Sequence, residues 1–224
     1  PGDVFFDVGS HLGFYSTLAA GLTTPDGRIH TFEAQEWLIP HLNESVAING
    51  LQERVRVNNV AVVAVDGGSV RIYPARDDDN TGSASLQDHD WVDTSTAHQV
   101  SGIALDAYVI RNGIDRIDGM KIDVEGAEIG VIEGMTTILA TMPPRLMMIE
   151  LMLNADGMDR DARDGAQAVC ETLSDAGYTV HHINMDGTLG NRFDLQSTTG
   201  VTIGNFGFAH KTLRADRPDM FKAE

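Results

Sequence analysis

Short apolar segments alternate with longer amphipathic segments along most of the chain. Segment 4–6 is apolar throughout, as expected of a strand buried on both faces of a parallel sheet, and segment 14–22 after it has helical spacing. Seven strands are predicted, at 4–6, 28–33, 54–58, 117–123, 145–151, 178–184 and 206–210. Helices are predicted at 14–22, 37–49, 105–112, 128–142 and 160–176. The pattern predicts an α/β fold with a mostly parallel seven-stranded sheet, helices on both faces and an antiparallel edge strand pair.

The segment from residue 62 to 104 interrupts this alternation. Short strands are predicted at 70–73 and 98–104, and the residues between them are rich in Asp, Asn, Gly, Ser and Thr. A strand pair with a long loop fits this pattern, and long loops in compact domains often act as lids or binding loops. Asn80 and Ser85 lie in the loop and are predicted to bind substrate. A solvated acidic loop without a binding role is the alternative.

The first strand leads into a glycine turn that has an acid ahead of it. Asp7, Gly9 and Gly13 give the pattern D-x-G-x-x-x-G, whereas a dinucleotide-binding turn needs G-x-G-x-x-G. Glycines let a ligand approach the backbone, and the following helix directs N–H groups at it. An acid in place of the first glycine would repel a pyrophosphate but suits the cationic head of S-adenosylmethionine. The predicted donor site comprises Asp7, Gly9, Ser10, His11 and Gly13, and the alternative is a turn that only connects strand and helix.

The ends of the second and third strands carry further donor-site candidates. Glu33 closes the second strand, where an acid can accept hydrogen bonds from both ribose hydroxyls of a nucleoside. Ala34 follows it and is included in the predicted site. Asn59 and Val60 end the third strand, where the adenine would lie. An exposed glutamate and an ordinary turn asparagine are the alternatives.

The fourth and fifth strands also end in acids. Asp123 and Glu125 follow the fourth strand, and Glu150 lies near the end of the fifth. Because the carboxyl ends of parallel strands meet at one edge of a sheet, these acids should lie beside the donor. Deprotonating a hydroxyl acceptor needs a base, for which Asp123 and Glu125 are the catalytic candidates. Asp123 is also assigned to the donor site, Glu150 to substrate binding, and Lys121 shares a strand face with Asp123.

Composition narrows the range of partners. The formal net charge is −17, and such a surface repels nucleic acid and anionic membrane. The eight histidines show no ligand spacing, so no metal is predicted, although a metal-dependent reaction with Asp123 as a ligand is an alternative. The single Cys170 favours a reducing cytoplasm, and no apolar run has the length of a membrane span. The chain opens at Pro1 just before a core strand, so we expect residues 1–224 to be one domain truncated at its N-terminus.

Five segments, in order, resemble the FkbM-type methyltransferases. They are FFDVGSHLGFYS at 5–16, FEA at 32–34, LDAYV at 105–109, IDGMKIDVEGAE at 117–128 and MMIEL at 147–151. KIDVEGAE is the most specific of them, and NTGSASL at 80–86 is similar to a loop of the family. The resemblance implies a Rossmann-like class I methyltransferase fold. It also implies S-adenosylmethionine-dependent O-methylation of a small-molecule or carbohydrate hydroxyl, on a sugar, glycan or secondary metabolite.

Two other functions are compatible with the sequence. One is a catalytically silent module that binds S-adenosylmethionine, which the strand-end acids disfavour. The other is an NAD-dependent oxidoreductase, which Asp7 disfavours because it replaces a glycine. The acceptor and the oligomeric state do not follow from the sequence. The choice of acceptor is expected to depend on residues 80–86 and on the segment after Leu151.

Overall fold

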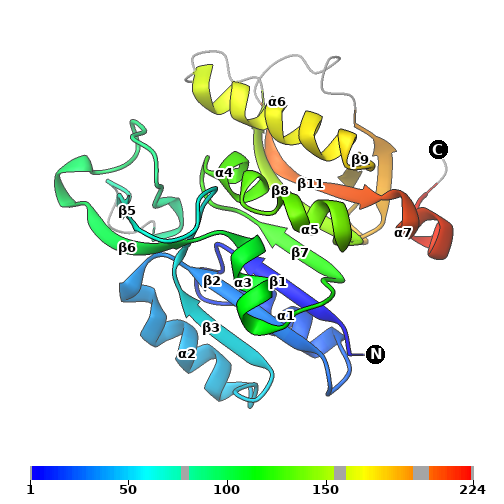
Figure 1. The fold of residues 1–224 in the computed structure, drawn as a ribbon, viewed down its shortest axis with the longest axis horizontal. Helices are drawn as coiled ribbons and strands as arrows, with labels where there is room; N and C mark the ends of the chain where they lie inside the picture. Colours follow the sequence, from blue (N-terminus) through cyan, green and yellow to red (C-terminus); the bar gives the residue numbers. More distant parts are fainter. Residues whose placement is uncertain (1, 77–80, 154–159, 194–201, 223–224) are drawn as a thin grey trace.

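An eight-stranded sheet in the order β3–β2–β1–β7–β8–β11–β9–β10 forms the centre of the protein in a computed structural model (Figure 1). The structure describes residues 2–76, 81–153, 160–193 and 202–222. The strands are β1 (Val4–Val8), β2 (Arg28–Glu33), β3 (Val55–Asn59), β7 (Gly119–Ile122), β8 (Leu146–Leu153), β9 (Tyr178–Ile183), β10 (Leu189–Arg192) and β11 (Thr202–His210). The first five of these pair in parallel, while β11 pairs antiparallel with β8 and β9, and β10 pairs antiparallel with β9.

The predicted fold class is confirmed, but the sheet has eight strands rather than seven. The additional strand, β10, has the sequence LGNR, which lacks the apolar alternation that marks a strand. The predicted antiparallel pairing at one side of the sheet is present. β11 lies between β8 and β9, and β10 forms the edge on that side.

Helices cover both faces of this sheet, because neighbouring strand residues point to opposite sides. Phe6 packs on one face with α3 (Leu105–Asn112), α4 (Glu128–Glu133), α5 (Thr136–Thr141) and α6 (Arg160–Asp175). Phe5 packs on the other face with α1 (Phe14–Leu22) and α2 (Ile39–Ile48), which a short 3-10 helix (Glu36–Leu38) precedes. The last helix, α7 (Lys211–Asp216), packs beside β10 and β11. Burial on both faces explains why the β1 sequence shows no polar alternation.

The predicted helix at 128–142 is two helices, α4 and α5, separated at Gly134 and Met135. The backbone of Gly134 lies against the segment after β3, where a Cβ atom would come within 2.3 Å of the Val63 carbonyl oxygen. A new helix starts after it, because the Asp106 carboxylate accepts the N–H groups of Thr137 and Ile138 at 2.8 and 2.9 Å. The apolar spacing continues across the break, so the sequence pattern alone predicted one helix.

The segment between β3 and α3 forms a second, smaller sheet that we call the insertion, residues 61–103. Its strands are β4 (Ala61–Val62), β5 (Ser69–Ile72) and β6 (His98–Ile103), in the order β4–β6–β5. The predicted strand pair is confirmed as β5 and β6, which pair antiparallel. Figure 1 shows β5 and β6 to the left of the main sheet. Among the described residues, no helix is long and apolar enough to cross a membrane.

Candidate functional site

A cavity of about 480 Å³ opens at the carboxyl ends of β1, β2, β7 and β8, with the insertion on its far side. This is the edge at which open parallel sheets bind ligands. Nine of the predicted site residues line it: Gly9, Ser10, His11, Glu33, Ala34, Val60, Asp123, Glu125 and Glu150. The cavity therefore joins the predicted donor residues to the predicted catalytic acids.

Four other predicted residues lie close to this cavity without lining it. Asp7 is buried in β1, Gly13 ends the glycine turn at the start of α1, and Asn59 donates its side-chain amide to the Glu33 carbonyl oxygen at 2.9 Å. Ser85 is buried and donates its hydroxyl to a backbone carbonyl. The fifth residue, Asn80, lies outside the described residues. The predicted roles of these residues in binding stay predictions.

The glycine turn contacts the turn that follows β7. Gly9 has φ +75°, and a Cβ atom there would lie 1.8 Å from the Asp123 carbonyl oxygen. The N–H groups of Gly9 and Ser10 both donate to the carbonyl of Phe32, at 2.9 and 3.1 Å. The sequence predicted that a glycine here admits a ligand; in the structure, its absent side chain admits the neighbouring backbone. Gly9 thus allows the turn after β1 to pack against the turn after β7.

Asp7 is fully buried beneath α1. Its carboxylate accepts the hydroxyl of Ser16 at 2.6 Å, and the Lys121 ammonium lies 4.0 Å from its other oxygen. Burial raises the pKa of the Asp7 carboxyl, while Lys121 and Ser16 act in the opposite direction. These contacts join the end of β1 to α1, which lie on either side of the glycine turn.

Lys121 links the two turns from inside the protein. Its ammonium donates to the Gly9 carbonyl at 2.7 Å and lies 3.1 Å from the Asp123 carboxylate. The side chain is 5% exposed and also lies 5.4 Å from the centre of the Tyr15 ring. The two-residue spacing from Asp123 correctly indicated a pair on one strand face. The bond to Gly9, however, comes from the packing of β7 against β1, which the sequence alone does not show.

Glu33 is a buried acceptor held by backbone N–H groups. Its two carboxylate oxygens accept the N–H of His11 at 2.7 Å and the N–H of Gln35 at 2.8 Å. Burial raises the pKa of Glu33, and these backbone hydrogen bonds lower it. A carboxylate has about four lone-pair positions, so each oxygen can still accept a ligand hydroxyl.

Two buried polar atoms at the cavity have no hydrogen-bond partner among the described residues. They are the hydroxyl of Ser10 and the side-chain oxygen of Gln35, and both residues are about 5% exposed. Buried polar atoms cost free energy unless they are paired, so a polar ligand in the cavity would satisfy them. Sequence reasoning missed Gln35; its position two residues after the acid of the second strand was the available signal.

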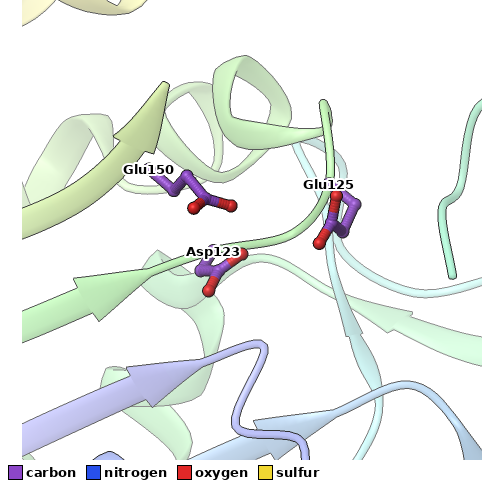
Figure 2. A group of neighbouring side chains, drawn as sticks. All are labelled: Asp123, Glu125 and Glu150. Carbon is purple, nitrogen blue, oxygen red and sulfur yellow. The ribbon is translucent and has the colours of Figure 1, made fainter. Parts of the chain in front are cut away.

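Asp123, Glu125 and Glu150 form an acidic cluster that also lines the cavity. Figure 2 shows the three carboxyl groups directed at one space, from the ends of β7 and β8 and from the turn beyond Asp123. One oxygen of each lies within 4.8 Å of one oxygen of the others. Such spacing would also suit a divalent cation, and the Lys121 ammonium already supplies positive charge at Asp123.

Burial and the neighbouring acids raise the pKa of two carboxyl groups in this cluster. Burial, followed by the charges of Asp123 and Glu150, raises the pKa of Glu125 to about 7. Burial and the Asp123 charge likewise raise the pKa of Glu150. Each of these two carboxyl groups can therefore exchange a proton near neutral pH, which is the property of a general base.

Comparisons with known proteins agree with this geometry. Residues 7–180 match the model of the methyltransferase FkbM domain. A methyltransferase FkbM structure from Methylobacillus flagellatus KT superposes with a TM-score of 0.56 at 13% identity, over 93% of this chain and 43% of that one. This chain therefore spans less than half the length of that protein.

Two ligand-bound structures have the same fold. An O-methyltransferase from Bacillus cereus in complex with SAH superposes with a TM-score of 0.52 at 14% identity, over 92% of this chain and 72% of that one. The O-methyltransferase TomG from Streptomyces achromogenes, in complex with SAM, gives a TM-score of 0.50 at 14% identity over the same shares. No curated protein sequence matches the chain.

Proposed function

Because the chain belongs to the FkbM methyltransferase family, we propose that it transfers a methyl group from S-adenosylmethionine to a hydroxyl of a small-molecule or carbohydrate acceptor. The observation that carries the proposal is the cavity itself. One end offers the polar groups that a nucleoside needs, and the other end offers carboxyl groups that can take a proton near neutral pH.

The donor end of the cavity fits S-adenosylmethionine. Glu33 would accept the ribose hydroxyls, the unpartnered atoms of Ser10 and Gln35 would bind polar groups of the donor, and Val60 would pack against the adenine. The acids on the other side suit the positive charge of the ligand. When bound, the donor would supply a methyl group on a sulfonium sulfur, and that sulfur would leave as a neutral thioether.

The acidic cluster would bind the acceptor hydroxyl and take its proton. A hydroxyl placed between Glu125 and Glu150 could hydrogen-bond to both and lose its proton to whichever is ionised. Asp123, next to Lys121, would orient the acceptor for in-line attack at the methyl group. In this proposal the Lys121 ammonium supplies the positive charge at the cluster, so the reaction needs no metal ion.

The net charge of the protein indicates which kind of acceptor it would bind. A formal net charge of −17 favours a neutral acceptor, such as a sugar, a glycan or a secondary metabolite, over nucleic acid or a membrane surface. The expected cytoplasmic location rests on the single, buried Cys170. Residues 1–224 are proposed to form one catalytic domain.

Calorimetric titration with S-adenosylmethionine and with NAD tests the donor. The proposal expects binding of the former only, and binding of NAD alone would support the oxidoreductase instead. A screen of hydroxylated metabolites with methyl-labelled donor, with and without a chelator, then tests the reaction. A protein that binds the donor and methylates none of them would be the silent module, and activity lost in the chelator would show that a metal takes part.

A further inference from the structure

The insertion contacts the turn that carries Glu125. The hydroxyl of Ser85 donates to the carbonyl of Glu125 at 2.7 Å, and the side-chain amide of Gln87 donates to the carbonyl of Gly126 at 2.8 Å. The N–H of Gln87 donates to the Ser85 hydroxyl oxygen at 3.1 Å, which leaves the hydroxyl proton for the turn. Two consecutive carbonyls of the turn are therefore held by one short segment of the insertion.

The turn needs this support because its backbone is strained. Glu125 has φ +52°, and the left-handed region costs a residue with a side chain about 1–2 kcal/mol. The N–H groups on the opposite side of the turn are also held. The Glu128 carboxylate accepts those of Val124 and Gly126, both at 3.2 Å. Side chains thus fix the turn through its carbonyls and through its N–H groups.

Ser85 is itself anchored firmly enough to act as a support. Its backbone exchanges two hydrogen bonds with Tyr73 at the end of β5, at 2.8 and 3.0 Å. The residue is 1% exposed and does not line the cavity. Its hydroxyl is directed at the backbone of the turn, where it donates to the Glu125 carbonyl. The sequence predicted that Ser85 binds substrate; in the structure its hydroxyl bonds to the protein backbone.

We propose that Ser85 and Gln87 are positioning residues that hold the left-handed turn and so direct the Glu125 carboxyl at Asp123 and Glu150. The proposal rests on the proposed function, since it is the proton transfer from the acceptor that needs this carboxyl in place. Without the two hydrogen bonds, the strained turn relaxes and the carboxyl moves towards solvent. The insertion then contributes to the reaction without touching the reacting atoms.

Carbon-13 NMR of protein labelled at the glutamate carboxyl carbons tests this directly. Glu125→Gln identifies the Glu125 resonance by its disappearance, and the titration midpoint of that resonance is then measured in wild type, Ser85→Ala and Gln87→Ala. We expect the midpoint to fall by about one pH unit in each variant, because the carboxyl becomes more exposed to solvent and leaves its acidic neighbours. Ser85→Thr, which keeps the hydroxyl, should have the wild-type midpoint.

Ser101→Ala, at an exposed serine of β6, is the matched control and should leave the midpoint unchanged. An unchanged midpoint in both Ser85→Ala and Gln87→Ala would overturn the proposal, as would an equal shift in Ser101→Ala. Should Ser85→Ala fail to fold, Gln87→Ala decides alone, because the half-buried Gln87 loses a single side-chain hydrogen bond to the turn. Calorimetry with S-adenosylmethionine on the same samples separates the two proposals. Failure of the wild-type protein to bind the donor would refute the proposed function, whereas the midpoints test the positioning of Glu125.

Discussion

Two glutamates at the same cavity are held in opposite ways. The oxygens of Glu33 accept backbone N–H groups at 2.7 and 2.8 Å, so its carboxylate is a fixed acceptor. The carboxyl of Glu125 faces Asp123 and Glu150, and burial, followed by these two charges, raises its pKa to about 7. A carboxyl paired with donors binds a ligand, whereas a carboxyl crowded by acids can exchange a proton at neutral pH.

The backbone produces this difference. The turn after β1 directs the His11 N–H at Glu33, and the turn after β7 directs the Glu125 side chain into the acidic cluster. Gly9 is the position at which the two turns meet. The comparison therefore predicts that changes at the meeting point damage both ends of the cavity, and that changes at either glutamate damage only one.

Gly9→Ala should have the largest effect. A Cβ atom at this position would overlap the Asp123 carbonyl and would also sit at φ +75°, so we expect a loss of about 3 kcal/mol in the free energy of unfolding. Urea unfolding measures the loss. Gly67→Ala is the matched control, because Gly67 has φ +84° with no heavy atom within 4 Å of an added Cβ. Its cost should be only the backbone strain, about 1–2 kcal/mol. Equal losses in the two variants would refute close contact between the turns.

Glu33→Ala should weaken donor binding by at least tenfold, or about 1.4 kcal/mol, because it removes the ribose acceptor and frees two backbone N–H groups. Calorimetric titration with S-adenosylmethionine measures this. The exposed neighbour Glu36 provides the control, and Glu36→Ala should bind the donor as wild type does. Unchanged affinity in Glu33→Ala would remove Glu33 from the donor site.

Glu125→Gln should make the protein more stable at alkaline pH. The pKa of this carboxyl is higher in the folded protein, about 7, than its ordinary value of 4.5, so its contribution to stability is present below pH 4.5 and is lost as the pH rises through 7. At pH 8 the variant should melt about 2–4 °C above wild type, equivalent to about 1 kcal/mol, which is less than the full pKa difference because solvent screens this partly exposed carboxyl. At pH 4.5 the two proteins should melt together. Glu53→Gln, at an exposed glutamate, should show no such pH dependence. A gain of equal size at both pH values would contradict the raised pKa.

The sequence predicted most of the parallel sheet, because apolar strands and glycine turns mark it directly. It also predicted that Glu33 and Asp123 reach one cavity, since strand ends converge in a parallel sheet. It did not show that Asp7 points beneath α1 or that Ser85 reaches the turn at Glu125. Both depend on how distant segments pack, which residue spacing along the chain does not encode.

The most direct measurement of the central claim compares donor binding with methyl transfer in Glu33→Ala and Glu125→Gln, using S-adenosylmethionine and an acceptor found in the metabolite screen. Glu33→Ala is expected to lose donor affinity. Glu125→Gln is expected to keep the wild-type affinity and lose turnover. A Glu125→Gln variant that loses donor affinity as much as turnover would make the acidic cluster part of the donor site and contradict the division of the cavity into two ends.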